Sequence, residues 1–102
     1  MTSHEFNEYI LYHENDPNSN VVATVHCFFD EKSVGFIRFY KGDVPGPSIL
    51  RGGLIEVTFP AERIQEIITT IRYEEPLFIS AQGEKSMLST VREPVGEQEA
   101  KD

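Results

Sequence analysis

Apolar and polar residues alternate with a period of two along most of the chain, which is the spacing of a β-strand that buries one face. Turn-forming residues interrupt this alternation and divide it into separate predicted strands. These strands are 5–13, 21–29, 34–40, 54–59, 77–82 and 86–92. In the first of them, Phe6, Ile10 and Tyr12 share one side, and Tyr9 and Leu11 share the other.

Two pairs of predicted strands are close enough in sequence to form hairpins. Residues 21–29 and 34–40 are joined by the short polar segment 30–33, which favours a hairpin. Near the end of the chain, Gly83 and Glu84 form the pair typical of a type II′ turn, because glycine comes first. That turn would place Ile79 opposite Leu88.

One segment has the period of an α-helix. Its apolar residues recur at i, i+3, i+4 and i+7, and they are Ile64, Ile67, Ile68 and Ile71. Pro60 suits the first helical position, and Pro76 disfavours a helical residue before it, so the helix should end by about Tyr73. Isoleucine is a poor helix former, so packing of this stripe on an apolar surface must stabilise the helix.

The order of elements predicts the fold class. Four strands, one helix and two strands favour an α+β domain with a curved antiparallel sheet of about six strands and the helix packed on its inner face. One helix cannot cover six strands, and several strands are apolar on both faces, as at Phe28, Phe36, Phe78 and Met87. The remaining face needs a partner or a second sheet layer, and we expect a second copy to cover it, as a homodimer. Residues 1–92 form the predicted domain, and 93–102 form an acidic, largely flexible tail.

Length and composition limit the class of protein. The 102 residues suffice for one domain, and 29 Leu, Ile, Val and Phe residues exclude general disorder. The sequence shows no secretory signal and no apolar run long enough to span a membrane. Cys27 is the single cysteine, so no intrachain disulfide can form, and we expect a cytoplasmic protein.

The charge balance disfavours two kinds of partner. The chain has 17 acidic and 9 basic residues, a net charge of −8. Negative charge repels the phosphates of nucleic acids and of anionic membranes, so direct binding to either is not expected. Solubility is the simplest explanation of the charge. The alternative is an acidic inhibitor that imitates nucleic acid and binds a basic protein.

Candidate catalytic and metal-binding residues are few. His26 and Cys27 are adjacent, but neighbours on a strand point to opposite faces, so the two cannot pair, and Cys27 is best interpreted as a small core residue. The soft metal ligands are these two with His4 and His13, without the spacing of a zinc site. His13 could meet His26 if the first two strands pair. The sequence predicts no catalytic, cofactor or metal residues, and an enzyme is disfavoured.

The segment 41–53 is the remaining candidate for recognition. It carries Val44, Ile49, Leu50 and Arg51 among glycines and prolines. One interpretation is a loop folded over the sheet edge; the other is a recognition loop or dimer arm that contacts a partner through these four residues.

Three segments resemble a family of small uncharacterised bacterial proteins with a C-terminal EPVGE segment. They are 34–40, the predicted helix continued to residue 79, and 92–97. The resemblance implies no activity and no site residue, but it implies that 93–97 is a meaningful part of the chain. The element order is also similar to that of Whirly-type single-strand-binding modules, whose strands are basic where this chain is acidic. We therefore expect a non-catalytic interaction or accessory module that acts as a homodimer.

Overall fold

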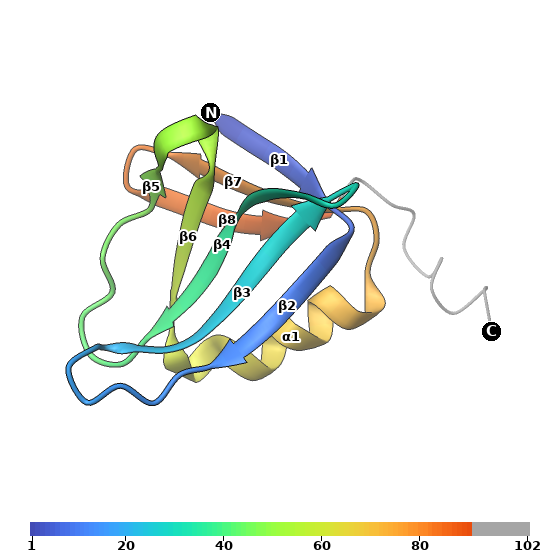
Figure 1. The fold of residues 1–102 in the computed structure, drawn as a ribbon. Helices are drawn as coiled ribbons and strands as arrows, with labels where there is room; N and C mark the ends of the chain where they lie inside the picture. Colours follow the sequence, from blue (N-terminus) through green and yellow to red (C-terminus); the bar gives the residue numbers. More distant parts are fainter. Residues whose placement is uncertain (91–102) are drawn as a thin grey trace.

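The computed structural model describes residues 1–90 and contains, within them, eight strands and one α-helix (Figure 1). The elements are β1 (Thr2–Phe6), β2 (Glu8–His13), β3 (Val21–Phe29), β4 (Lys32–Tyr40), β5 (Ser48–Ile49), β6 (Ile55–Pro60), α1 (Ile64–Tyr73), β7 (Leu77–Gln82) and β8 (Lys85–Ser89), with short 3-10 turns at Arg51–Gly53 and Ala61–Arg63. The predicted α+β class is confirmed. The predicted tail, 93–102, lies outside the described residues.

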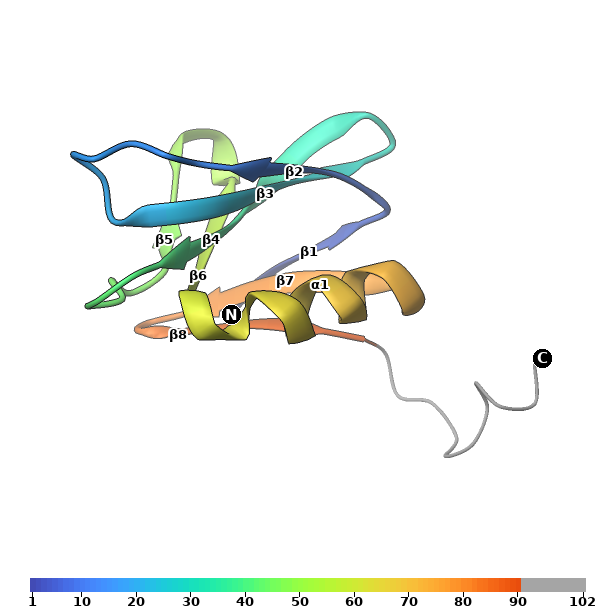
Figure 2. The ribbon, with the colours of Figure 1, turned by 90° about the horizontal axis from the view of Figure 1, so that it is seen from below.

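The strands form two sheets rather than the single curved sheet predicted from the sequence. One sheet has the order β2-β3-β4-β6-β5, and the other has the order β1-β7-β8. Seen from below, the five-stranded sheet forms one layer, and the three-stranded sheet and α1 form the second (Figure 2). The helix and the smaller sheet together cover the inner face of the five-stranded sheet. The sequence predicted that the helix alone would pack on this face.

The division into two sheets begins at Asn7, inside the segment predicted as one strand. The backbone N–H of Asn7 donates to Phe28 O at 2.9 Å, and its side-chain amide donates to Asp30 Oδ1 at 3.1 Å. The chain turns at this corner, so that β1 pairs with β7 while β2 pairs with β3. The alternation of apolar and polar residues does not reveal this corner, because it continues through both halves, and only the polar Asn7 marks it.

The prediction of an antiparallel arrangement fails for one pair of strands. β4 and β6 run parallel, with Gly35 opposite Ile55 and Tyr40 opposite Pro60. The connection between them, 41–54, is long enough to return the chain to the start of β4. Within this connection β5 pairs antiparallel with β6 and forms the far edge of the sheet.

Both predicted hairpins are present. Gly83 has a φ of 60°, Gln82 pairs with Lys85, and Ile79 lies opposite Leu88, as predicted. The first hairpin is tighter than expected: Asp30 and Glu31 have φ values of 50° and 73°, the left-handed pair of a type I′ turn. The polar segment 30–33 is therefore a two-residue turn, and β4 begins at Lys32.

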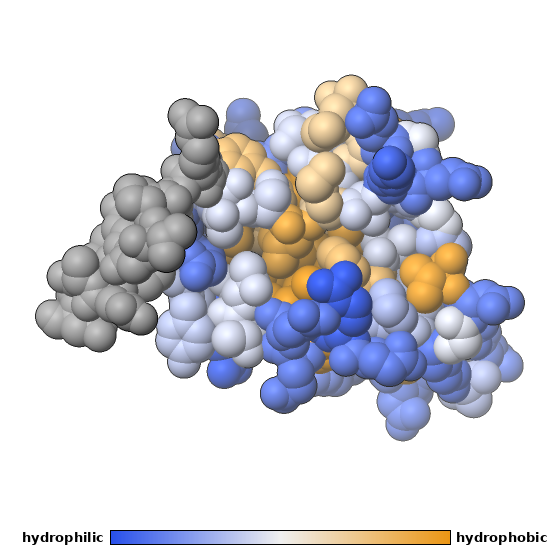
Figure 3. Space-filling model, turned by 180° about the vertical axis from the view of Figure 1, so that it is seen from behind, coloured by the Kyte–Doolittle hydropathy of each residue, from blue (hydrophilic) through white to orange (hydrophobic). Residues whose placement is uncertain are grey.

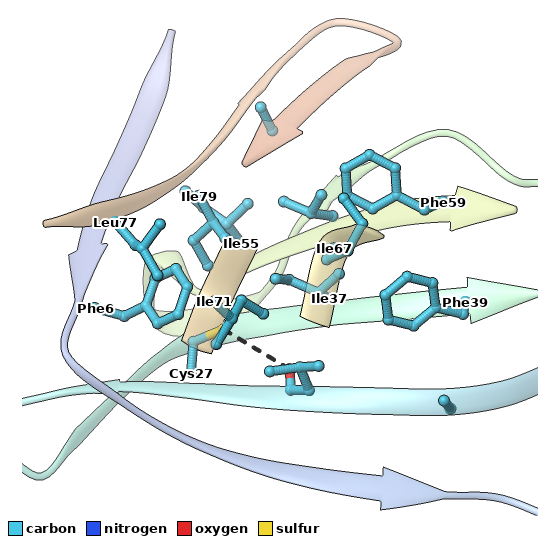
Figure 4. Packing of buried hydrophobic residues seen from close by; sticks show 14 residues of the cluster. Phe6, Cys27, Ile37, Phe39, Ile55, Phe59, Ile67, Ile71, Leu77 and Ile79 are labelled. Atoms are coloured by element: carbon cyan, nitrogen blue, oxygen red, sulfur yellow. Dashed lines mark hydrogen bonds between the residues drawn. The ribbon is translucent and has the colours of Figure 1, made fainter. Parts of the chain in front are cut away.

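The core lies between the two layers (Figure 4). It includes Ala23, Val25 and Cys27 of β3 and the alternate residues Ile55, Val57 and Phe59 of β6. Helix α1 contributes Ile67 and Ile71, which are buried, and Ile64 and Ile68 pack against the core from its sides. The isoleucine stripe and the helix end at Tyr73 are confirmed; the first turn after Pro60 is a 3-10 turn, so α1 begins at Ile64.

Candidate functional site

The outer face of the five-stranded sheet carries side chains that the second layer does not cover. It is turned toward the viewer in Figure 1, with the second layer behind it. Side chains alternate along a strand. The neighbours of the buried Val25 on β3, and of the buried Ile37 and Phe39 on β4, therefore point outward on this face. We call this surface the aromatic face and define it as Ile10, Tyr12, His26, Phe28, Phe36, Arg38, Tyr40 and Glu56.

Cross-strand register assembles these side chains into rows. Ile10 lies opposite His26, His26 opposite Phe36, and Phe36 opposite Glu56. At the edge of the sheet, Ile10 and Tyr12 remain 46% and 47% exposed. The rest of the aromatic face is less exposed because its members pack on one another.

His26 lies between two phenylalanine rings. Its ring centroid is 4.2 Å from that of Phe28 and 4.5 Å from that of Phe36, and its Nε2 is 2.7 Å from Ser33 Oγ. Burial in this stack lowers the pKa of His26 from its ordinary value. The lowered pKa favours the neutral imidazole near pH 7, so the three stacked rings form an uncharged group on this face.

The charged residues of the face neutralise each other. Arg38 forms an ion pair with Glu56, and its guanidinium lies 4.9 Å from the centroid of the Phe36 ring. Burial raises the pKa of Tyr40, and the negative charge of Glu56 raises it further, while Arg38 acts against both. The Tyr40 hydroxyl consequently stays protonated and can donate a hydrogen bond. This combination of rings, one balanced ion pair and hydroxyl groups suits recognition of another molecule without proton transfer.

The four residues predicted as partner contacts lie at and beyond the opposite edge of the same sheet. Ile49 on β5 is 51% exposed, Val44 is 37% exposed, and Arg51 is exposed. Ser48 and Ile49 pair with β6, and Leu50 N–H donates to Leu54 O at 2.7 Å, so this part of the segment folds back on the sheet edge. Val44 lines a cavity of about 680 Å³ between this loop and β8, which the other three residues do not line. Their contact with a partner stays a prediction.

The histidines and the cysteine do not form a common site. Cys27 is fully buried, its Sγ donates to Val25 O at 3.8 Å, and burial raises the pKa of its thiol to about 12. His26 points to the other face of the sheet, as predicted. β2 and β3 do pair, but Ala23 lies opposite His13 and Ile10 opposite His26, so the two histidines do not meet. Residues 1–90 contain no group of three or more His, Cys, Asp or Glu residues able to hold a metal ion.

Sequence reasoning found part of the aromatic face and missed the rest. It identified Phe28 and Phe36 as apolar residues on the second side of their strands. It did not find Ile10 and Tyr12, which it placed on one side with the buried Phe6. The available signal was the polar Asn7 between them, which marks the corner between β1 and β2.

An acidic cleft of about 640 Å³ lies where α1 ends. Among its lining residues are Glu5, Glu74 and Glu75, with Arg72 as the basic residue and Tyr9 and Tyr73 as aromatic residues. The C-terminal end of a helix carries partial negative charge, which adds to that of the carboxylates. The cleft therefore favours positively charged groups.

The back of the molecule differs from the aromatic face. Figure 3 shows a hydrophobic patch near its centre and a smaller, separate one at the right, among hydrophilic residues. On β8, Met87 is 42% exposed. This side presents a mostly hydrophilic surface to solvent.

Comparisons with protein-family models, curated proteins and solved structures gave no match. The resemblance to small bacterial proteins with an EPVGE segment thus stays a prediction, and that segment lies outside the described residues. No helix within residues 1–90 is long and apolar enough to cross a membrane.

Proposed function

We propose that this chain is a non-catalytic protein-interaction module that acts as a homodimer and binds its partner through the aromatic face. The observation that carries the proposal is the His26 stack beside the exposed Ile10 and Tyr12, on a sheet face that the second layer leaves uncovered. Aromatic side chains and arginine are enriched where proteins bind one another.

Substitution within the stack tests the proposal. Phe36→Ser removes a ring beneath both His26 and Arg38, and Phe78→Ser is the matched control, a half-buried phenylalanine on β7. The full-length chain and both variants are immobilised, and proteins captured from a lysate of the source organism are compared. We expect the wild type and the control to retain a common protein that Phe36→Ser loses. Equal capture by all three chains would contradict binding through this face.

The acidic cleft favours a second candidate function. A surface lined by Glu5 and Glu75 at a helix C-terminus, on a chain of net charge −8, supports an acidic inhibitor that binds a basic protein. Such a complex should weaken steeply with salt and should be lost in the double variant Glu5→Gln, Glu75→Gln. Capture that survives high salt and needs Phe36 favours the first function instead.

A further inference from the structure

Resting on the proposed homodimer, we propose that two copies join by antiparallel pairing of their β2 strands, with Ile10 of each copy on the two-fold axis. The pairing joins two five-stranded sheets into one continuous sheet and places the two aromatic faces side by side. The existence of a dimer is part of the proposed function. Its arrangement is inferred from the geometry of β2.

The backbone of β2 has groups available for a second strand. Among the described residues β2 ends the strand order and pairs with β3 alone. Glu14 N–H donates to Val22 O at 2.9 Å, in register with the whole β2–β3 ladder. Because the bonds of an antiparallel ladder alternate, the even-numbered residues of β2 bond β3. Tyr9, Leu11 and His13 therefore direct their N–H and C=O groups away from the sheet.

β2 lacks three of the features that keep edge strands from pairing. Lysine, proline and bulges serve that purpose in many proteins. The segment Glu8–His13 has neither residue, and its register with β3 is unbroken. The opposite edge, β5, is only two residues long, and β8 begins with Lys85. β2 also carries three of the eight large apolar or aromatic residues that are exposed within residues 1–90: Tyr9, Ile10 and Tyr12.

Symmetry and charge select the register. Two copies form one continuous sheet only if residues of the same face lie opposite each other. The two such registers that overlap most of β2 place Ile10 opposite Ile10 or Leu11 opposite Leu11. The pairing centred on Leu11 opposes Glu8 to Glu14 of the second copy, and like charges directly opposite are destabilising. The pairing centred on Ile10 places Glu8 opposite Tyr12, whose hydroxyl can donate to the carboxylate.

The pairing centred on Ile10 also satisfies the backbone. Tyr9 of each copy lies opposite Leu11 of the other, and these are residues whose N–H and C=O groups point outward. Ile10 forms the non-hydrogen-bonded pair, in which the two Cα atoms are about 4.5 Å apart. The exposed side chain of Ile10 thereby packs beside its equivalent on the joined aromatic faces.

The dimer should be weak and strengthened by salt. Six-residue edges give an interface smaller than the roughly 1,600 Å² of standard complexes, so we expect dissociation in the micromolar range. Both copies carry a charge of −8, so screening reduces their repulsion. Sedimentation equilibrium of the full-length chain from about 5 to 500 μM should show a dimer, and the dimer should dissociate in Ile10→Lys, because a lysine on the axis faces its equivalent.

Cross-linking tests the arrangement separately from the existence of a dimer. Ile10→Cys brings two thiols within the Cα separation that a disulfide requires, whereas Cys27 is buried and unreactive. Tyr12→Cys is the matched control, on the same strand and face and 47% exposed, but its copies would lie roughly 13 Å apart. Ile49→Cys reports on the opposite edge. We expect mild oxidation to cross-link Ile10→Cys at least ten-fold faster than either control.

Each of the other outcomes contradicts a defined part of the proposal. A wild-type chain that remains monomeric over the whole concentration range overturns both the homodimer and the pairing. A dimer in which Ile10→Cys cross-links no faster than the controls leaves the homodimer and overturns the β2 pairing; faster cross-linking of Ile49→Cys would move the interface to β5. A dimer in which Leu11→Cys cross-links faster than Ile10→Cys overturns the register.

Discussion

Gly35 on β4 lies where neither the neighbouring strand nor the second layer leaves room for a side chain. A Cβ atom added there would lie 2.1 Å from Ile55 O and 2.8 Å from Ile79 Cδ1. Backbone on the neighbouring strand cannot yield as a flexible side chain can. We expect Gly35→Ala to lower the free energy of unfolding by about 3 kcal/mol or more. Urea denaturation measures the loss.

Gly46→Ala is the matched control for this substitution. An added Cβ at Gly46 meets nothing within 4 Å. The change should shift the free energy of unfolding by about 0.5 kcal/mol or less. Equal effects of the two substitutions would show that β4 and β6 are not packed as closely as described.

His26 should make stability depend on pH. Burial in the aromatic stack lowers the pKa of its imidazole below the ordinary 6.5, so the unfolded chain binds the proton more tightly than the folded chain. The stabilising contribution of the neutral ring is therefore complete above pH 6.5 and is lost as the pH falls below it. We expect the decrease in the free energy of unfolding from about pH 7.5 to 5.5 to be smaller in His26→Gln than in the wild type. An unchanged decrease would contradict the stack.

The orientation of a side chain was predictable from the sequence where it depends only on the alternation within one strand. The opposite orientations of His26 and Cys27 follow from alternation, and the structure confirms them. The exposure of Ile10 and Tyr12 was not predictable in this way. Alternation groups them with Phe6, but the corner at Asn7 moves Phe6 into the other sheet, where it is buried.

Helix α1 depends on its isoleucines rather than on helix propensity. Ile71 is 6% exposed and packs in the core, whereas Ile68 is only partly buried beside it. We expect Ile71→Ala to destabilise the protein by about 2–5 kcal/mol and Ile68→Ala by about 1–2 kcal/mol. Thermal and urea unfolding compare the two variants. A larger loss of stability in Ile68→Ala than in Ile71→Ala would show that a different face of the helix packs against the sheets.

Elements that depend on local signals, the two hairpins included, were predicted well, whereas the pairings between distant strands were not. The four isoleucines and Pro76 determined the helix and its end, and Gly83 determined the last hairpin with its register. The pairing of β1 with β7 joins residues far apart in the chain, and the parallel β4–β6 pair depends on the course of the segment 41–54. Such pairings depend on which apolar surfaces bury each other. The pattern of residues within one segment does not indicate which distant segment will pair with it.

The whole molecule has two layers but one core. Phe6 of the smaller sheet, Ile71 of the helix and Ile37 of the larger sheet belong to the same buried cluster (Figure 4). The covalent chain also crosses between the layers at Asn7 and again through the helix. Neither layer can bury its apolar face without the other, so the two sheets should unfold together.

Amide hydrogen exchange tests this cooperativity. Interior amides of β3, β4 and β7 should exchange only through global unfolding, with the same free energy of opening, because each of these strands has a neighbour on both sides. The amides of Tyr9 and Leu11, which point outward from β2, should exchange much faster in dilute samples. Added denaturant should lower the opening free energy of β4 and β7 with equal slope. If β7 opened at a free energy several kcal/mol below that of β4, the smaller sheet would be a separate unit, and the shared core would not account for the stability of the fold.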